Sequence, residues 1–427
     1  MNPPPSDRPP PWPGEPGAAA PKADAGGTLG AADIVDAGRG ISRRIQVVNV
    51  PVVRASSVLF DSVEAAFAEA PPATVGERHR ATYATSGTET TFALMDALAT
   101  LEGKPHRCRA ALMPSGLAAI STALLAFTKP GDHLLMSDSD YGPARVFVTT
   151  LLARFGVRTT FFDPGIEVEG PGGLEELIEP ETRAIYLESP GSYTFEIQDV
   201  PAICALARRR GIVTMLDNTY ASPCLARPFD WGVDMTLVAL TKYWAGHSDL
   251  LMGAVVVREE LFPTLWAAVK QLGICVGGDD AWLVLRGMRT VDVRMRRHQE
   301  TGLAVARWLQ GRPEVRRVLH PGLPEHPGHD LFKRDFLGSC GLMSFELQPA
   351  SQAQVAALCN GRRHFSIGYS WGGYESLIMP AVIGGARSVT KWTGGPLIRI
   401  HCGLEDADEL IGDLAEGLNA LTAAASG

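Results

Sequence analysis

From about residue 108 onward, short apolar runs alternate with amphipathic stretches of helical length, and this alternation restricts the fold more than any other feature of the chain. Strands buried on both faces are apolar throughout, whereas the helices that cover them keep one polar side. The pattern therefore predicts a large three-layer α/β domain with a mostly parallel sheet, which binds ligands at the carboxyl ends of its strands. The expected strands are 110–113, 133–137, 158–163, 183–188, 213–218, 235–240 and 254–257.

Helices are expected between most of these strands, and one of them carries clear start signals. Asp199 is a suitable N-cap, and Pro201 falls in the first turn that follows it. After about residue 290 the strands become sparser and follow one long helix, which predicts a smaller C-terminal α/β domain packed on the first. The expected helices are 117–127, 144–155, 200–210, 290–310 and 407–422.

The N-terminus differs from the rest, because nine of the 31 prolines fall within the first 21 residues. Such a composition extends as polyproline-like coil and cannot form a core, so we expect a disordered leader over residues 1–40. It lacks the basic and apolar regions of an export signal. The longest apolar run, 116–127, is far shorter than the roughly 18 residues that a membrane-spanning helix needs.

Charge and cysteine content narrow the function classes. With 39 basic and 47 acidic residues, the net charge is −8, which argues against nucleic acid as the partner. The seven cysteines are scattered and form no CxxC pair, so neither a disulfide framework nor a thiolate zinc site is expected, and a cytoplasmic location is favoured. His326 and His329 lack a third ligand, so we expect no metal site. The GxxxxGK[ST] and GxGxxG motifs are also absent.

Lys242 follows a strongly apolar run in ALTKYWAGHSD, residues 239–249. Burying an ammonium group is costly, whereas an amine that forms a Schiff base loses its charge and is a useful nucleophile. A lysine that merely reaches solvent from a strand end is the alternative for this residue taken alone. Lys242 is therefore a candidate for covalent attachment of a cofactor.

Two further motifs support the same kind of site. Asp217 ends an apolar strand in TMLDNTY, where a carboxylate can hold a pyridine nitrogen protonated. In LMPSGLAAIS, a strand runs into a helix, so that the N–H groups of Gly116 and Leu117 face an anion. A lysine, an aspartate and a phosphate-binding turn on one sheet together indicate pyridoxal phosphate.

These motifs, in this order and spacing, resemble the cysteine and methionine metabolism family of pyridoxal-phosphate enzymes, of fold type I, over residues 45–422. The resemblance rests on SGLAAISTALLAFTKPGDHLL, LESPGSYTFEIQDVPAI, LDNTY and TKYWAGHSD. Within the family, residues 326–347, 365–377 and 397–411 are similar to the bacterial cystathionine β-lyases. Ser192 stands where γ-synthases and γ-lyases usually carry asparagine.

The resemblance implies a role for each matching residue. Lys242 would hold the cofactor and move the Cα proton, Tyr141 would stack on the ring, and Asp217 would contact the ring nitrogen. Gly116, Leu117 and Thr241 would bind phosphate, and Ser192 would lie among the cofactor-binding residues. Arg399 would bind the substrate carboxylate, and Ser370 and Trp371 would line the substrate pocket. Tyr83 would reach the site of the neighbouring subunit, which implies a homo-oligomer, a tetramer built as a dimer of dimers.

The resemblance also implies a division of the chain. The leader at 1–40 would be followed by an N-terminal arm at 41–100 that contacts the neighbouring subunit, by the cofactor-binding domain at 101–289 and by the C-terminal domain at 290–427. The chain departs from the family at Thr85, where an arginine usually pairs with the phosphate, and at Ala239, usually a serine. Two interpretations of these departures are open: the cofactor binds more weakly, or Arg80 replaces the missing contact with the phosphate.

The activity implied is β-elimination from an amino-acid thioether, L-cystathionine, to homocysteine, pyruvate and ammonia in methionine biosynthesis. Two alternatives stay open. One is a broader cysteine-S-conjugate β-lyase, or γ-lyase or γ-synthase chemistry, since pocket selectivity cannot be read from one chain. The other is a non-catalytic homologue that binds the cofactor or serves as a scaffold, suggested by the loss of the usual phosphate contacts at Thr85 and Ala239.

Overall fold

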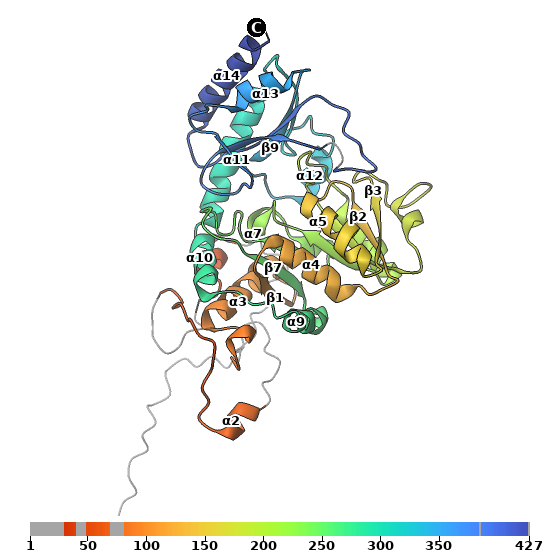
Figure 1. Ribbon diagram of the computed structural model, residues 1–427, viewed down its shortest axis with the longest axis vertical. Coiled ribbons are helices and arrows are strands. Elements are labelled where there is room, and N and C mark those ends of the chain that lie inside the picture. The colour runs from red at the N-terminus through yellow and green to blue at the C-terminus, as the bar shows by residue number, and fades with distance from the viewer. Residues whose placement is uncertain (1–29, 40–47, 69–80, 384–385, 426–427) are drawn as a thin grey trace, which may run out of the picture.

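The structure is a computed structural model that describes residues 30–39, 48–68, 81–383 and 386–425 (Figure 1). Among these residues, a seven-stranded sheet has the order β1-β7-β6-β5-β4-β2-β3. All neighbours from β6 to β3 are parallel, whereas β7 runs antiparallel to both β1 and β6. The strands are β1 (Cys108–Met113), β2 (His133–Ser137), β3 (Arg158–Phe162), β4 (Thr182–Glu188), β5 (Val213–Asp217), β6 (Met235–Ala239) and β7 (Gly253–Arg258).

The expected three layers are confirmed, because helices cover both faces of this sheet. In β1, Ala110 and Leu112 pack in the same core as helix α3 (Glu89–Gly103), whereas Ala111 and Met113 pack with α4 (Gly116–Phe127). A sheet covered on both faces needs apolar residues at consecutive positions, which is why the strands read as unbroken apolar runs. The other helices of this region are α5 (Gly142–Phe147), α6 (Val200–Arg210), α7 (Ser222–Leu225), α8 (Pro228–Trp231), α9 (Phe262–Gln271) and α10 (Gly278–Met288).

A second, smaller sheet follows in the chain and lies at the top of Figure 1, as expected. Among the described residues it has five strands in the order β10-β11-β12-β9-β8, packed with helices α11, α13 and α14. The long helix α11 runs beside both sheets (Figure 1). The elements are α11 (Val291–Gln310), β8 (Val315–Leu319), α12 (His329–Asp335), β9 (Leu342–Leu347), α13 (Gln352–Cys359), β10 (Ser366–Ile367), β11 (Leu377–Ala381), β12 (Leu397–His401) and α14 (Ala407–Ala423).

The seven strands predicted for the large sheet are all present, with ends that differ by at most two residues. The start of α6 is confirmed as well, since the Asp199 side chain accepts a hydrogen bond from the Ala202 N–H at 3.2 Å. The helix predicted over 144–155 is not continuous. It begins as α5 and passes into a π-helical turn at Val148–Leu152, where the Thr150 hydroxyl donates to the carbonyl of Val146 at 2.6 Å. Such local hydroxyl bonds compete with the regular helical pattern.

The N-terminal boundaries differ from the expectation in two places. Residues 30–39 fall within the expected disordered leader, yet Ala31–Asp36 forms helix α1, with Ile34 buried and its carbonyl accepting from Arg289. Helix α3 crosses the expected boundary at residue 100 and is buried along nearly its whole length, so its first residues belong to the core of the large sheet. Residues 1–29 lie outside the described residues. Helix α2 (Val63–Phe67) extends away from the body (Figure 1).

The described part of the chain has neither a candidate membrane-spanning helix nor a candidate metal cluster. Within it, no helix has both the length and the apolar character needed to cross a bilayer. Nor do three or more histidine, cysteine or acidic side chains gather there in a way that could hold a metal ion.

Candidate active site

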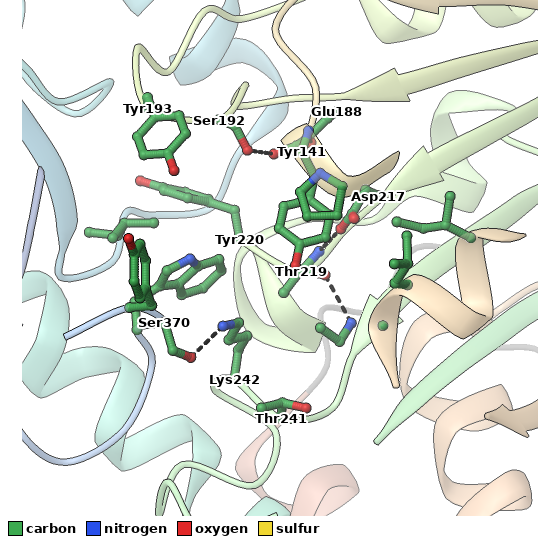
Figure 2. A pocket seen from close by; sticks show the side chains of 18 of the residues that line it. Tyr141, Glu188, Ser192, Tyr193, Asp217, Thr219, Tyr220, Thr241, Lys242 and Ser370 are labelled. Atoms are coloured by element: carbon green, nitrogen blue, oxygen red, sulfur yellow. Dashed lines mark hydrogen bonds between the residues drawn. The ribbon is translucent and has the colours of Figure 1, made fainter. Parts of the chain in front are cut away.

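A cavity of about 490 Å³ opens where β4, β5 and β6 end and α4 begins, and residues of the smaller sheet close its other side (Figure 2). Parallel strands bring their carboxyl ends to one edge, so residues that are distant in the chain meet there. This cavity is lined by all but one of the cofactor- and substrate-site residues that were predicted from the sequence. They are Gly116, Leu117, Tyr141, Ser192, Asp217, Thr241, Lys242, Ser370, Trp371 and Arg399.

Lys242 lies just after β6, and its side chain extends toward the smaller sheet. Its Nζ donates a hydrogen bond to Ser370 Oγ and lies 5.3 Å from the centre of the Trp371 ring. Burial and the neighbouring Arg399 guanidinium lower the pKa of Lys242 to about 8, although Asp217 opposes the shift. A substantial fraction of this lysine is therefore neutral near physiological pH, the form in which an amine acts as a nucleophile or base.

Asp217 is the last residue of β5 and lies at the opposite side of the cavity floor (Figure 2). Its Oδ1 accepts a hydrogen bond from the Thr219 N–H at 2.9 Å. Burial raises the pKa of Asp217, while the Thr219 hydrogen bonds and Lys242 act in the other direction. A buried acid of this kind is stabilised as a carboxylate by a cationic partner, which a protonated pyridine nitrogen supplies.

The turn into α4 brings backbone amides to the cavity. Ser115 caps the helix by accepting from the Ala118 N–H at 3.1 Å, and the first helical residues, Gly116 and Leu117, line the cavity. The first N–H groups of a helix have no partner inside the helix and favour an anion. The turn lies against β6, since a Cβ on Gly116 would come within 2.8 Å of the Ala239 Cβ.

The hydroxyl of Thr241 is already engaged in hydrogen bonds. Its Oγ1 accepts from the Met252 N–H at 3.0 Å and lies 3.2 Å from the Met252 carbonyl oxygen. Thr241 therefore has one remaining acceptor position at the cavity, and any anion contact from it must redirect this hydroxyl.

Arg399 lies on β12 of the smaller sheet and faces the cavity. Its Nη2 donates to the backbone carbonyl of Ser370 at 3.0 Å, and its guanidinium carbon is 5.7 Å from the centre of the Tyr193 ring. Burial lowers the pKa of Arg399, which remains far above neutrality as for any arginine. The cavity thus has a fixed cation on the side opposite Asp217.

Glu188 lines the cavity but was not singled out from the sequence. It ends β4, its Oε2 accepts from the Tyr141 N–H at 2.6 Å, and its Oε1 is hydrogen-bonded to Ser192 Oγ at 2.7 Å. The available signal was its position at the end of an apolar strand in LESPGS, the same kind of position that identified Asp217. Tyr193 and Thr219, which also line the cavity, were missed as well.

Tyr83 does not line the cavity of its own chain. About half of the residue is exposed, and its backbone pairs with Ser57 in an isolated bridge. Thr85 lies close by and borders a separate small gap beside Trp266. Arg80 lies outside the described residues.

Pyridoxal phosphate requires an amine for attachment, an acid for its ring nitrogen and amides for its phosphate. Lys242, Asp217 and the turn at Gly116 supply these groups around a single cavity, and the raised pKa of Asp217 fits a cationic ring nitrogen. The fold and the site together define a pyridoxal-phosphate-dependent enzyme.

Comparison with known proteins identifies the family. The family model described as Cys/Met metabolism PLP-dependent enzyme matches residues 31–419, and the chain belongs to this family. It is 41% identical to cystathionine beta-lyase MetC of Escherichia coli, over 90% of this chain and 96% of that protein. It is 39% identical to an L-alanine/L-glutamate racemase of Wolbachia pipientis, with the same coverage of both chains.

A solved structure supports the fold assignment. Cystathionine gamma synthase from Xanthomonas oryzae pv. oryzae, in complex with aminoacrylate and cysteine, matches with a TM-score of 0.82 and 33% sequence identity. The match covers 93% of this chain and 99% of that chain. The fold type I architecture predicted from the sequence is therefore confirmed, and the cofactor of this family is pyridoxal phosphate.

Proposed function

We propose that this protein is a carbon–sulfur β-lyase that converts L-cystathionine and water into homocysteine, pyruvate and ammonia, a step of methionine biosynthesis. The observation that carries the proposal is the meeting of Lys242 and Arg399 at Ser370 in one cavity. An amine for the Cα proton then lies close to a guanidinium suited to the α-carboxylate. The similarity to the Escherichia coli lyase over most of both chains supports the same reaction.

Each side chain has a defined task in this reaction. Arg399 binds the α-carboxylate of the amino acid and so orients the Cα–H bond. Lys242 Nζ, whose lowered pKa leaves it partly neutral, takes the proton from Cα. The C–S bond at Cβ then breaks, and the sulfur leaves as the homocysteine thiolate. When bound, pyridoxal phosphate supplies the electron sink for the negative charge that develops at Cα.

The remaining residues hold the cofactor. Asp217 keeps the ring nitrogen protonated, Tyr141 stacks on the ring, and Ser192 lies among the cofactor-binding residues. The amides of Gly116 and Leu117, with Thr241, bind the phosphate. Ser370 and Trp371 line the substrate side of the cavity. The partner subunit's Tyr83 completes the site and assists proton transfer.

The products distinguish β- from γ-chemistry. Purified protein loaded with pyridoxal phosphate is incubated with L-cystathionine, and the keto acids are quantified. β-Elimination gives pyruvate with an equal amount of homocysteine, whereas γ-elimination gives 2-oxobutyrate and cysteine. A predominance of 2-oxobutyrate would overturn the proposal. A panel of S-alkyl cysteines and cystine, assayed for pyruvate, measures how broad the β-lyase activity is.

Two other outcomes have their own readouts. Racemisation is a second candidate, because a racemase relative matches this chain as extensively as the lyase does; L-alanine and L-glutamate, assayed for D-isomers, test it. A non-catalytic homologue, the other alternative, would show no product from any of these substrates. A protein that stays colourless when pyridoxal phosphate is added would favour a scaffolding homologue, whereas one that turns yellow but forms no product would favour a cofactor-binding homologue.

We also propose a cytoplasmic homo-oligomer, a tetramer built as a dimer of dimers. Large apolar side chains of the N-terminal arm are exposed in the single chain, with Leu59 94% and Phe67 83% accessible. Exposure on this scale is typical of a surface that another subunit covers.

Sedimentation equilibrium measures the assembly, and mixing Tyr83→Phe with Lys242→Ala subunits tests site sharing. If each site uses residues of both chains, mixed dimers regain one intact site.

A further inference from the structure

The carboxyl group of Glu188 joins two segments that each contribute a side chain to the cavity. Its Oε2 accepts from the Tyr141 N–H at 2.6 Å, and its Oε1 is bonded to Ser192 Oγ at 2.7 Å (Figure 2). Tyr141 follows β2, whereas Ser192 follows β4, so the two segments leave neighbouring parallel strands that are far apart in the sequence. The Glu188 backbone is itself held by Gln198, whose Nε2 donates to its carbonyl at 2.7 Å.

The surroundings of this carboxyl group are strongly acidic. Asp217 is its direct register partner on β5, so both side chains leave the sheet on the same face. Asp140 lies close by, buried, with neither carboxyl oxygen hydrogen-bonded. Arg387 lowers the pKa of Glu188 electrostatically, but its guanidinium is hydrogen-bonded to Glu196 and Thr194. Neighbouring buried carboxyl groups with so little cationic compensation cannot all be ionised.

Burial and the Asp217 charge raise the pKa of Glu188 to about 8. A neutral carboxyl group has one oxygen that accepts and one O–H that donates. A neutral Glu188 can therefore satisfy both of its partners. One oxygen accepts from the Tyr141 N–H, which can only donate, and the O–H can donate to the Ser192 hydroxyl, which can also accept. The hydrogen-bond geometry accommodates the neutral acid, and the buried neighbouring carboxyl groups favour it over the carboxylate.

We propose that Glu188 is a positioning residue that acts as a neutral acid, holding Tyr141 and Ser192 in place while Asp217 carries the negative charge beside the cofactor. The role concerns cofactor binding and does not depend on which amino acid the enzyme cleaves. The role of Glu188 is tested by cofactor affinity, whereas the proposed lyase activity is tested by the reaction products. A failure of one proposal can therefore be distinguished from a failure of the other.

Glu188→Gln and Glu188→Ala, with Glu181→Gln as an exposed control next to β4, provide the main test. Glutamine mimics the neutral acid, since its oxygen accepts from Tyr141 and its amide donates to Ser192. We expect the dissociation constant for pyridoxal phosphate, measured by titrating the apoprotein, to stay within twofold of wild type in Glu188→Gln and in the control. In Glu188→Ala it should rise about tenfold or more, since both segments lose their common partner.

The pH dependence of this dissociation constant gives an independent readout. The ionisable groups near Glu188 are Asp217, Asp140, Tyr186, Tyr141 and Arg387. As pH rises through about 8, Glu188 ionises beside Asp217 and wild-type binding weakens. Glu188→Gln lacks this group, and Lys242 titrates in both proteins, so the difference between their profiles reports Glu188 alone.

Several results would overturn the proposal. If Glu188→Gln weakens binding as much as Glu188→Ala, Glu188 acts as an anion; if neither weakens it, Glu188 positions nothing that matters for the cofactor. Identical pH profiles for wild type and Glu188→Gln would also contradict it. Should Glu188→Ala fail to fold, Glu188→Asp replaces it. Aspartate is too short to reach both partners, so wild-type affinity in that variant would refute the role.

Discussion

The amine of Lys242 is hydrogen-bonded to the hydroxyl of Ser370, although 128 positions separate the two residues in the chain. Ser370 also accepts from Arg399 through its carbonyl oxygen, and it has a positive φ of 79°. A non-glycine residue keeps such a backbone only when its surroundings hold it there. The contact joins the edge of the large sheet to the smaller sheet, so the site depends on how the two halves of the chain pack.

Lys242→Ala should remove both covalent cofactor binding and catalysis. Because this amine is expected to attach the cofactor and to move the Cα proton, we expect turnover to fall by about 10³-fold or more. The long-wavelength absorbance of the loaded protein should disappear as well. Absorbance spectra and pyruvate assays check this, with Lys270→Ala as a control on the exposed end of α9. An unchanged spectrum in Lys242→Ala would exclude the assignment.

Covalent capture of pyridoxal phosphate by the apoprotein should depend on pH through Lys242. Only the neutral amine reacts, and the pKa of Lys242 is lowered to about 8 by burial and by Arg399. The capture rate should therefore rise as pH increases through about 8. Arg399→Gln removes a neighbouring positive charge that disfavours the ammonium form, so the midpoint should move to higher pH.

Stopped-flow absorbance at a series of pH values measures both midpoints. Direct titration of the apoprotein, in which reductive methylation labels Lys242, gives the pKa without the cofactor. A wild-type midpoint near the ordinary lysine pKa of about 10.4 would contradict the role of burial. A midpoint that stays at its wild-type pH in Arg399→Gln would show that Arg399 does not influence this amine.

Gly253→Ala should displace the turn into α4, which we propose binds the phosphate. A Cβ at residue 253 would lie 2.2 Å from the Ser115 carbonyl oxygen and 2.9 Å from the Gly116 Cα, both backbone atoms that cannot yield by a side-chain rotation. Overpacking of this kind costs about 1–3 kcal/mol. We expect weaker binding of pyridoxal phosphate together with a lower melting temperature.

The matched control for this substitution is Gly412→Ala, on helix α14, where an added Cβ meets no atom within 4 Å. Alanine favours a helix over glycine by about 1 kcal/mol, so this variant should be at least as stable as wild type. Cofactor titration and thermal melts distinguish the two variants. Equal cofactor affinity in both would show that the turn tolerates the added methyl group.

Asp138 should make stability depend on pH in the acid range. Its side chain is inaccessible, and its oxygens accept from the N–H groups of Ser388, Val389 and Thr390 at 2.7–3.0 Å and from Arg145 at 2.9 Å. Burial alone would raise the pKa of Asp138, but these donors lower it to about 2. Folding therefore favours the carboxylate, which stabilises the protein above the unfolded-state pKa of about 3.9.

This contribution, about 2–3 kcal/mol, should be lost as pH falls from about 4 toward 2. Asp138→Asn should remove it at every pH, because an amide cannot accept from all the same donors. Urea unfolding at pH 7 and at pH 3 measures the free energy of unfolding for both proteins. If wild type and Asp138→Asn lose the same stability between these pH values, Asp138 is not the responsible group.

The sequence by itself determined the large sheet and one side of the site. Strands buried on both faces must be apolar throughout, so their positions could be predicted to within two residues. Because parallel strands end at one edge, the residues that follow these runs, Asp217 and Lys242, could be expected to meet. The turn into α4 was recognisable for the same reason, since a strand followed by small residues and a helix is a local pattern.

Only the tertiary structure decided which contacts hold the cavity together and in what charge state its residues are. Helix α3 is buried on nearly all sides although it carries several polar residues, so its sequence has no clear periodic pattern that separates an arm from a core helix. Its burial depends on the sheet beneath it. The bonds from Glu188 to Tyr141 and Ser192 depend on how loops from two strands pack. The lowered pKa of Lys242 arises from burial and from Arg399, which lies 157 positions later in the chain. Such long-range contacts, and the charge states that follow from them, leave no local signal in the sequence.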